Sequence, residues 1–269
     1  MSTPPVPAPV PTRTQLIDHL VRTRIAGDVA TPRENNRAHY KELVEGNRHY
    51  WLGLEFGDRW TDEHAVLSVM AERCGVVADP DYRVGQDTID PELTVDALDR
   101  MAVALRKAAE GRHRVLVATG HPAGLLPVHQ AVAVALKAVG CTLYALPSRK
   151  LYADEGDIRQ VGDVAMIHRQ GSLMHTHSPE PMATILAALE EDGEPLPDLV
   201  LADHGWAGRA GQCGISTVGF ADCNDPALFL GEAEGTLAAV VPLDDNVPPQ
   251  FYAPMTAYLL DTAGLLHEE

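Results

Sequence analysis

Residues 115–124 read VLVATGHPAG. Four apolar residues in a row are closed by a Thr-Gly turn signal, and a helical pattern then runs from Pro127 to Val139 and stops at Gly140. A short strand that is apolar on both faces, followed by a turn and a helix, is the repeating unit of buried parallel sheets. This stretch therefore predicts the first strand and helix of an α/β fold.

Five further short runs rich in Val, Leu, Ile or Ala follow, at residues 142–146, 164–167, 199–202, 217–220 and 238–241. Most of them are separated by helical patterns or by Gly and Pro. The alternation predicts a Rossmann-like, doubly wound, mostly parallel sheet of five or six strands over residues 113–269.

The chain before residue 113 has helical periodicity, clearest at residues 94–109, and a loop composition rich in Asp, Pro and Gly at residues 76–92. We expect a helical subdomain over residues 13–112 that contains no strand. Residues 1–12 hold five prolines and predict a flexible leader.

The composition excludes some partners. The 269 residues include 21 Lys and Arg against 38 Asp and Glu, a formal net charge of −17. Nucleic acids and anionic membranes require a positive surface, so neither is expected as a partner. The apolar runs are too short to span a bilayer and the N-terminus lacks signal-peptide features, so we expect a cytoplasmic protein with four reduced cysteines. A homo-oligomer is compatible with this composition.

Ligands of open α/β sheets bind at the carboxyl ends of the strands. Acidic and imidazole side chains follow several predicted strands here, and we expect them to meet at one edge: His121, His175, His177, Asp203, His204, Asp222, Asp225, Asp244 and Asp245.

The turn TGHPAG is a candidate phosphate site. Its glycines, Gly120 and Gly124, allow backbone N–H groups to approach an anion, and Thr119 and His121 add side-chain donors. Arg209 is a further candidate contact to substrate. The alternative is a tight strand-to-helix turn in which Gly and Pro serve the backbone only.

The acidic strand ends are candidate metal ligands. Asp203, Asp222, Asn224 and Asp225 offer the hard oxygen donors that Mg²⁺ or Mn²⁺ prefers, and Asp203 directly follows an apolar run. A bound metal would polarise a phosphate and activate water. Asp and Asn are also common in turns and helix caps, which is the alternative for each of them.

The stretch HTHS at residues 175–178 resembles the H-x-H motif of metal-dependent amidohydrolases and PHP-type phosphoesterases, although it lies in mid-chain. His175 and His177 could contact substrate, bind zinc, or be exposed residues beside a helix that Ser178 caps. The segments ENNRAHYKE and NRHYW, at residues 34–42 and 47–51, could close over the site or form a solvated helix face.

Four stretches give the chain a resemblance, over nearly its full length, to actinobacterial proteins labelled phosphatases: ATGHPAGLLPVH, HTHSPEPM, LADHGWAGRAGQ and FADCNDPALFLGEAEG. Two mechanistic families are similar in part. Residues 117–120 and 221–225 resemble motifs of haloacid-dehalogenase-like phosphatases, but their N-terminal nucleophile motif is missing. The layout of helical region and Rossmann-like domain is similar to that of damage-control phosphatases, without their Asp-Asn-x-Gly-Glu motif.

These observations lead to the hypothesis of a metal-dependent phosphatase acting on a small phosphorylated metabolite. Gly120, His121 and Gly124 would bind the phosphate, Asp203 with Asp222 or Asp225 would hold Mg²⁺ or Mn²⁺, and His204 or His121 would act as the general acid. The alternatives are a non-catalytic binding or sensor protein, and a sugar-phosphate isomerase or lyase.

Overall fold

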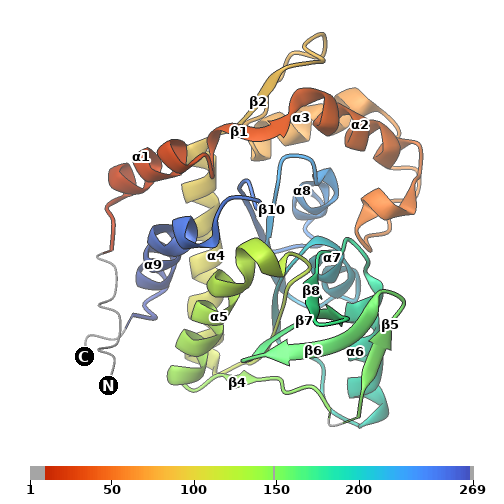
Figure 1. Ribbon diagram of the computed structural model, residues 1–269, viewed down its shortest axis with the longest axis vertical. Helices are drawn as coiled ribbons and strands as arrows, with labels where there is room; N and C mark the ends of the chain where they lie inside the picture. Colours follow the sequence, from red (N-terminus) through yellow and green to blue (C-terminus); the bar gives the residue numbers. More distant parts are fainter. Residues whose placement is uncertain (1–9, 148, 267–269) are drawn as a thin grey trace.

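The computed structural model describes residues 10–147 and 149–266, and a mixed sheet runs through its centre (Figure 1). The strand order is β11-β10-β9-β3-β7-β6-β5, with β4 beside β3 and β8 beside β7. The strands are β3 (Arg114–Ala118), β4 (Thr142–Leu143), β5 (Leu151–Ala153), β6 (Gly156–Val161), β7 (Val164–Arg169), β8 (Ser172–Met174), β9 (Leu199–Asp203), β10 (Thr217–Ala221) and β11 (Ala239–Pro242). The α/β fold predicted from the apolar runs is confirmed. The expected five or six strands are too few, because the described sheet has nine and β5, β6 and β8 lie outside the predicted apolar runs.

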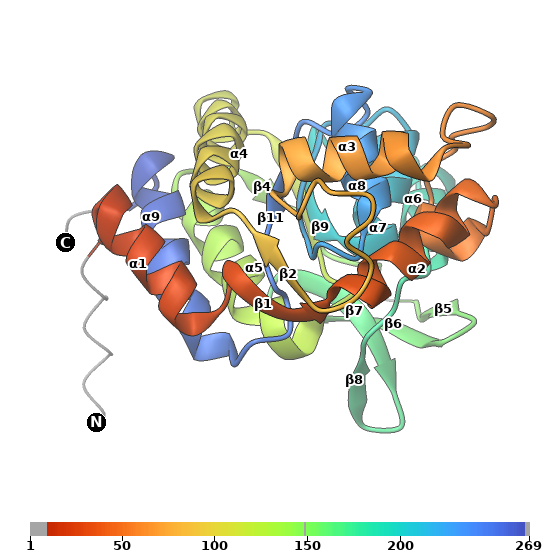
Figure 2. The same ribbon diagram turned by 90° about the horizontal axis from the view of Figure 1, so that it is seen from above.

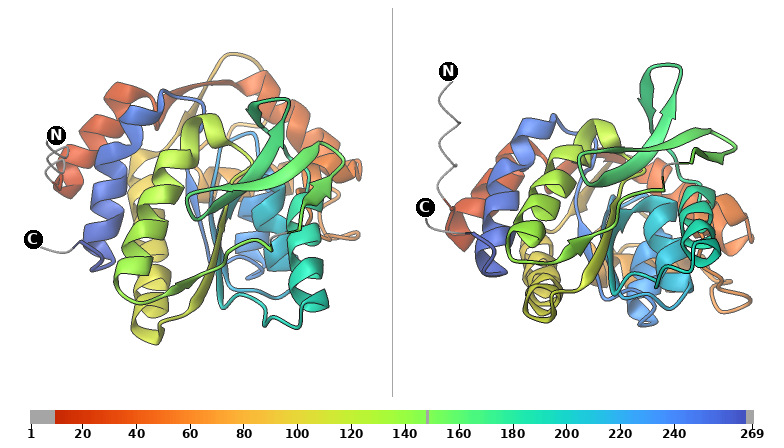
Figure 3. Two further views of the ribbon diagram at one scale, coloured as in Figure 1. Left: turned by 60° about the horizontal axis from the view of Figure 1, so that its bottom comes forward. Right: turned by 90° about the horizontal axis from the view of Figure 1, so that it is seen from below.

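Helices cover both faces of the parallel part of this sheet (Figure 1 and Figure 3). On one face lie α4 (Pro91–Gly111), α5 (Pro122–Ala138) and α9 (Ala253–Thr262), and on the other lie α6 (Glu180–Glu191), α7 (His204–Gln212) and α8 (Pro226–Ala233). Each strand from β9 to β11 is buried along its whole length, which explains why their sequences are apolar on both faces.

The order of the strands creates a switch point between β3 and β9. After β3 the chain moves to β4 and β7 on one side, and it then returns to β9 on the other side. Val117 of β3 pairs in parallel with Val164 of β7 and with Leu201 of β9. In open α/β sheets ligands bind at such a point, just beyond the carboxyl ends of the two strands.

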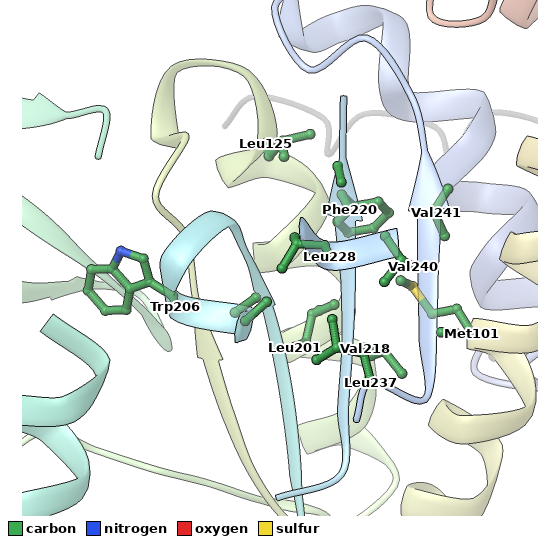
Figure 4. Close-up of a cluster of buried hydrophobic side chains, with 14 of the residues drawn as sticks. Met101, Leu125, Leu201, Trp206, Val218, Phe220, Leu228, Leu237, Val240 and Val241 are labelled. Carbon is green, nitrogen blue, oxygen red and sulfur yellow. The ribbon is translucent and has the colours of Figure 1, made fainter. Parts of the chain in front are cut away.

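The core beneath this edge is close-packed and apolar. Figure 4 shows side chains of β9, β10 and β11 between those of α4 on one side and α7 and α8 on the other. Trp206, Phe220 and Leu228 are fully buried there. Burial on this scale stabilises the fold by about 25 cal/mol per Å² of apolar surface, so it fixes the strand ends on which the site is built.

Two strands precede residue 113, and the expectation of a purely helical segment is wrong. Strand β1 (Gly27–Pro32) pairs antiparallel with β2 (Gln86–Ile89), which lies inside the stretch expected to be a loop. Both strands are short, and in β1 only Val29 is buried, so neither shows the pattern of a core strand. A fully buried ion pair of 2.9 Å between Arg33 and Asp87 lies beside them.

The remaining N-terminal elements lie across the carboxyl edge of the sheet (Figure 2). They are α1 (Arg13–Thr23), α2 (Arg33–Val44), the 3₁₀ helix η1 (Arg48–Trp51) and α3 (Glu63–Arg73); a second 3₁₀ helix, η2 (Pro249–Tyr252), precedes α9. Residues 1–9 of the predicted leader lie outside the described residues, and Thr12 already caps α1. The subdomain boundary at residue 112 stays a prediction. Within the described part of the chain, no helix combines the length and the apolar character that a membrane crossing needs.

Strands β6, β7 and β8 form an antiparallel extension of the sheet (Figure 2). Residues 164 and 165 of β7 pair with β3, whereas residues 167–169 pair with β8. The extension turns back at Gln170 and Gly171, both at positive φ, and then leads directly into residues 175–178. The histidines of the HTHS stretch are therefore placed by this hairpin.

Gly208 allows the N-terminal region to contact the α/β core. A Cβ atom at this position of α7 would lie 1.9 Å from the carbonyl oxygen of Leu52, which is backbone and cannot yield easily. We expect Gly208→Ala to lower the free energy of unfolding by about 2 kcal/mol, measured by denaturant titration. Val103→Ala, at an exposed position of α4, is the control and should change it by less than about 0.5 kcal/mol. An equal effect of the two substitutions would contradict the contact.

Candidate functional site

Four histidines meet at the switch point, beyond the carboxyl ends of β3 and β9. Their ring centroids are 4.4 Å apart for His121 and His175, 4.6 Å for His177 and His204, and 5.0 Å for His175 and His204. His121 and His204 are buried, while His175 is exposed and His177 is partly exposed. The cluster is thus open to solvent on the side of the HTHS stretch.

Asp203 connects the ends of β3 and β9. Its carboxylate accepts hydrogen bonds from the Thr119 hydroxyl at 2.5 Å and from the Gly120 N–H at 2.6 Å, both in the turn after β3. It also bonds to Nδ1 of His204 at 2.8 Å. Asp203 is fully buried, and although burial alone would raise the pKa of its carboxyl, the bonds and charge of His204 and its neighbours hold that pKa below its usual range.

The bond between Asp203 and His204 requires an uncommon backbone conformation. His204 has φ of 49°, in the left-handed region that non-glycine residues adopt at an energetic cost. The next residue is Gly205, where a Cβ atom would lie 2.2 Å from the carbonyl oxygen of His177. The backbone of the HTHS stretch therefore packs directly against the first turn of α7. In this conformation Nε2 of His204 faces the cluster.

Two carboxylates, Asp225 and Asp245, face the histidines. Nε2 of His204 lies 3.4 Å from Oδ2 of each, and Nδ1 of His121 lies 3.2 Å from Oδ2 of Asp245. Nε2 of His175 and Nε2 of His177 are 3.1 Å apart. Six side chains from five strand ends thus bring nitrogen and oxygen atoms close together, and two of the resulting groups, His121-His175-His204 and His177-His204-Asp225, have the proximity that metal ligation needs.

A third group, Asp222, Asp244 and Asp245, lies next to the histidines. Residues from β1 contact it, because the Thr31 hydroxyl donates to Asp222 at 2.5 Å and the Ala30 N–H donates to Asp244 at 3.1 Å. Burial and the neighbouring Asp carboxylates raise the pKa of Asp222 well above its usual value.

The site carries an excess of negative charge. Within the described residues, the five buried carboxyls of Asp203, Asp222, Asp225, Asp244 and Asp245 form no ion pair with a lysine or arginine, and their ion-pair partners are histidines. Burial lowers the pKa of His204, but the charges of Asp225, Asp203 and Asp245 outweigh it and raise that pKa to about 10. Burial raises the pKa of Asp225 to about 6.

The two HTHS histidines behave in the opposite way. Burial and the positive charge of His204 lower the pKa of His175 to about 4 and that of His177 to about 2. Both imidazoles are therefore neutral near pH 7, and a neutral imidazole has one nitrogen lone pair with which it can bind a cation.

Helices α5, α7 and α8 all begin at the site without a side-chain cap. Their N-cap residues are His121, Asp203 and Asp225, and none of these side chains accepts a hydrogen bond from a backbone N–H of its own helix. A capping side chain stabilises a helix by about 1 kcal/mol. These side chains are directed to the cluster instead, while the positive ends of the helix dipoles favour its carboxylates.

His129 lies behind Asp203 and is fully buried in α5. Its Nδ1 bonds to the Leu125 carbonyl at 2.9 Å, and its Nε2 lies 3.5 Å from Oδ2 of Asp203. The sequence pattern did not predict the contact between His129 and Asp203, because a single histidine in an apolar helix more often packs in the core than takes part in a site.

His49 of the N-terminal region contacts the cluster, and Tyr50 and His39 follow next to it. His49 stacks on His177 with parallel rings and centroids 5.4 Å apart, and Tyr50 contacts both His49 and His39. His39 bonds to the Asn224 carbonyl at 2.7 Å. Parts of the segments at residues 34–42 and 47–51 thus lie beside the cluster, and their closure over the site stays a prediction.

Several groups that were predicted to contact a phosphate or a metal ion contact other residues of the protein instead. The Thr119 hydroxyl and the Gly120 N–H donate to Asp203, and the position of a Cβ on Gly124 lies 2.3 Å from the Asp245 carbonyl oxygen. The Asn224 amide donates to Asn35. Arg209, on α7, has no hydrogen bond or ion pair to the cluster among the described contacts.

The low pKa of His177 makes the stability of the metal-free protein depend on pH. Below the ordinary value of 6.5 the unfolded chain binds a proton at residue 177 that the folded chain does not, so stability falls as pH falls. We expect the wild type to lose about 1–2 kcal/mol relative to His177→Gln between pH 7.5 and pH 5. Denaturant titrations of both proteins with a chelator present measure it. A difference that is the same at both pH values would contradict the shift.

Comparison with known proteins gives the family. A family model described as "Phosphatase" matches residues 11–267. The Streptomyces coelicolor protein named phosphatase SCO2771 is 62% identical over 262 residues, which cover 97% of this chain and 99% of that protein. The match extends through the N-terminal region and every strand end of the site. The chain therefore belongs to this phosphatase family.

Proposed function

We propose that the protein hydrolyses phosphomonoesters of small metabolites with the help of a divalent transition metal ion bound by the histidine cluster. The family and its named relative support phosphatase activity. The observation that carries the metal dependence is the close approach of imidazole nitrogen and carboxylate oxygen atoms around Nε2 of His204.

The donor distances fit a metal site. In a tetrahedral zinc site with bonds near 2.0–2.1 Å, neighbouring ligand atoms lie about 3.3 Å apart. The pairs here are separated by 3.1 Å for His175 and His177, 3.2 Å for His121 and Asp245, and 3.4 Å for His204 with Asp225. His121 Nδ1 is also a buried atom without a hydrogen-bond partner among the described residues.

The two histidine-containing groups describe one shared centre. Both include His204, whose Nδ1 is bonded to Asp203, so only its Nε2 can bind a metal. The ligands we propose are His204 with members of the set His121, His175, His177, Asp225 and Asp245. Imidazoles in this number favour Zn²⁺ over the Mg²⁺ that the acidic motifs indicated, while the two carboxylates of the set are compatible with Mn²⁺.

Asp203 then has a positioning role. A ligating histidine commonly donates its other N–H to a carboxylate, which fixes the ring and its tautomer. Here Asp203 would keep the proton on Nδ1 of His204, while a bound metal would take the place of the proton on Nε2. Asn224 is bonded to Asn35 and is not part of the ligand set that we propose.

When bound, the metal would neutralise phosphate charge and lower the pKa of a bound water. The protein's own groups do the rest. His175 lies at the exposed side of the cluster, where a phosphate would enter. His121 and His204 are buried on the opposite side, from which water is excluded. The acidity of the molecule disfavours nucleic acid, so a small ester is the substrate class we propose.

Metal removal tests this proposal directly. We expect dialysis against a chelator to lower the rate of phosphate release from 4-nitrophenyl phosphate by at least about 100-fold. Zn²⁺ or Mn²⁺ should restore the rate and raise the midpoint of thermal unfolding. Full activity of a protein shown by elemental analysis to be free of metal would contradict it. Binding of phosphate esters without turnover would instead favour the sensor alternative.

Asp203→Asn tests the positioning role. Loss of the carboxylate charge makes Nε2 of His204 a weaker ligand, so we expect metal affinity to fall by about 10- to 100-fold, measured by competition with a chromophoric chelator. Asp198→Asn is the matched control, since Asp198 directly precedes the same strand and pairs with Arg114. An equal loss of affinity in both variants would show a general effect of the fold and contradict the role.

A further inference from the structure

We propose that His49 is a catalytic residue that donates a hydrogen bond to the ester oxygen of the departing alcohol. This inference rests on the proposed phosphatase function and adds a residue from the N-terminal region to it. The geometry that points to it is the stacking of His49 over the exposed side of the cluster.

His49 lies next to His177, on the side of the cluster where we place the leaving group. Its ring is parallel to that of His177, with centroids 5.4 Å apart, and the ring of His177 is in turn 4.6 Å from that of His204. His49 and His175 are exposed, whereas His121 and His204 are buried. A phosphate bound at the cluster must therefore direct its alcohol toward the side on which His49 and His175 lie.

The imidazole of His49 is available for such a contact. Its side chain forms no hydrogen bond among the described contacts, where only its backbone N–H is engaged, by Asn47. The neighbouring histidine His39 differs, because its Nδ1 bonds to the Asn224 carbonyl and its Nε2 lies 3.4 Å from the Asn35 amide. Thus His39 supports the structure, while His49 has both ring nitrogens free.

The segment that carries His49 is held rigidly. Asn47 caps η1 through its side chain, and Leu52 ends it in the left-handed conformation. The Leu52 carbonyl then packs against Gly208 of α7, and Arg48 lies 3.9 Å from the ring centroid of Trp51. A donor on a fixed segment needs no reorganisation when the reaction occurs, which is the condition for effective electrostatic stabilisation.

The chemical role follows from the hydrolysis itself. The oxygen of water bonds to phosphorus, the P–O ester bond breaks, and its electron pair stays on the ester oxygen. That oxygen takes up the proton that the water releases and leaves as the alcohol. While negative charge builds on it, an imidazole N–H of His49 donates to it. This contact matters most when the alcohol is a weak acid.

The experiment compares two leaving groups. For His49→Ala we expect kcat/KM to fall by about 100-fold with an alkyl phosphate such as glycerol 2-phosphate, and by less than about 5-fold with 4-nitrophenyl phosphate, whose leaving group is stable as an anion. His49→Asn and His49→Gln, which place an amide N–H near the two ring-nitrogen positions, should recover part of the loss for the alkyl ester. Thermal unfolding of each variant checks that the fold is retained.

His64→Gln is the control, because His64 is an exposed histidine on α3 outside the cluster. It should leave both rates unchanged. An equal loss with both esters in His49→Ala, or no loss with either, would overturn the role of His49 and leave the phosphatase proposal standing. If the wild-type protein, loaded with Zn²⁺ or Mn²⁺, hydrolyses neither ester nor any other phosphomonoester, the proposed function itself fails.

Discussion

The site depends on one buried carboxylate that ties two neighbouring strand ends together. Asp203, the last residue of β9, accepts the hydroxyl of Thr119 and the N–H of Gly120 from the turn after β3, and it holds Nδ1 of His204. A buried charge is stable only when donors surround it, so each of these groups is fixed by the need to satisfy Asp203. At the switch point of the sheet, these bonds fix the orientation of the His204 ring and therefore the direction of its Nε2 atom.

Several local features around Asp203 are individually destabilising. His204 adopts a left-handed backbone conformation, and three helices begin without side-chain caps. Among the described residues, the buried carboxyls of the site form ion pairs with histidines and with no lysine or arginine. Such departures from local preference concentrate at functional sites and persist where the rest of the fold determines them. Here the packing of the apolar core around β9, β10 and β11 fixes the positions of the strand ends that carry these residues (Figure 4).

Sequence patterns predicted the second half of the fold well, because strands buried on both faces leave continuous apolar runs and Gly or Pro marks the turns. They also predicted that polar groups such as His121 and Asp225 would share an edge, since the carboxyl ends of parallel strands do so. They did not reveal β1, in which only Val29 is buried, or β2, where one of the two buried side chains is the charged Asp87. They also missed β5, β6 and β8, which lie outside the apolar runs. The partners of Asp203 and the approach of His49 also stayed hidden, because both arise from contacts between segments far apart in the chain.

We propose above all that the imidazole and carboxylate atoms around His204 bind a single shared metal ion. A crystal structure of the purified protein, with anomalous scattering data collected at the absorption edges of zinc and manganese, measures this most directly. We predict an anomalous peak within bonding distance of Nε2 of His204 and of two or more atoms of His121, His175, His177, Asp225 and Asp245. A catalytically active crystal in which that position holds no metal, or in which the metal binds elsewhere, would contradict the claim.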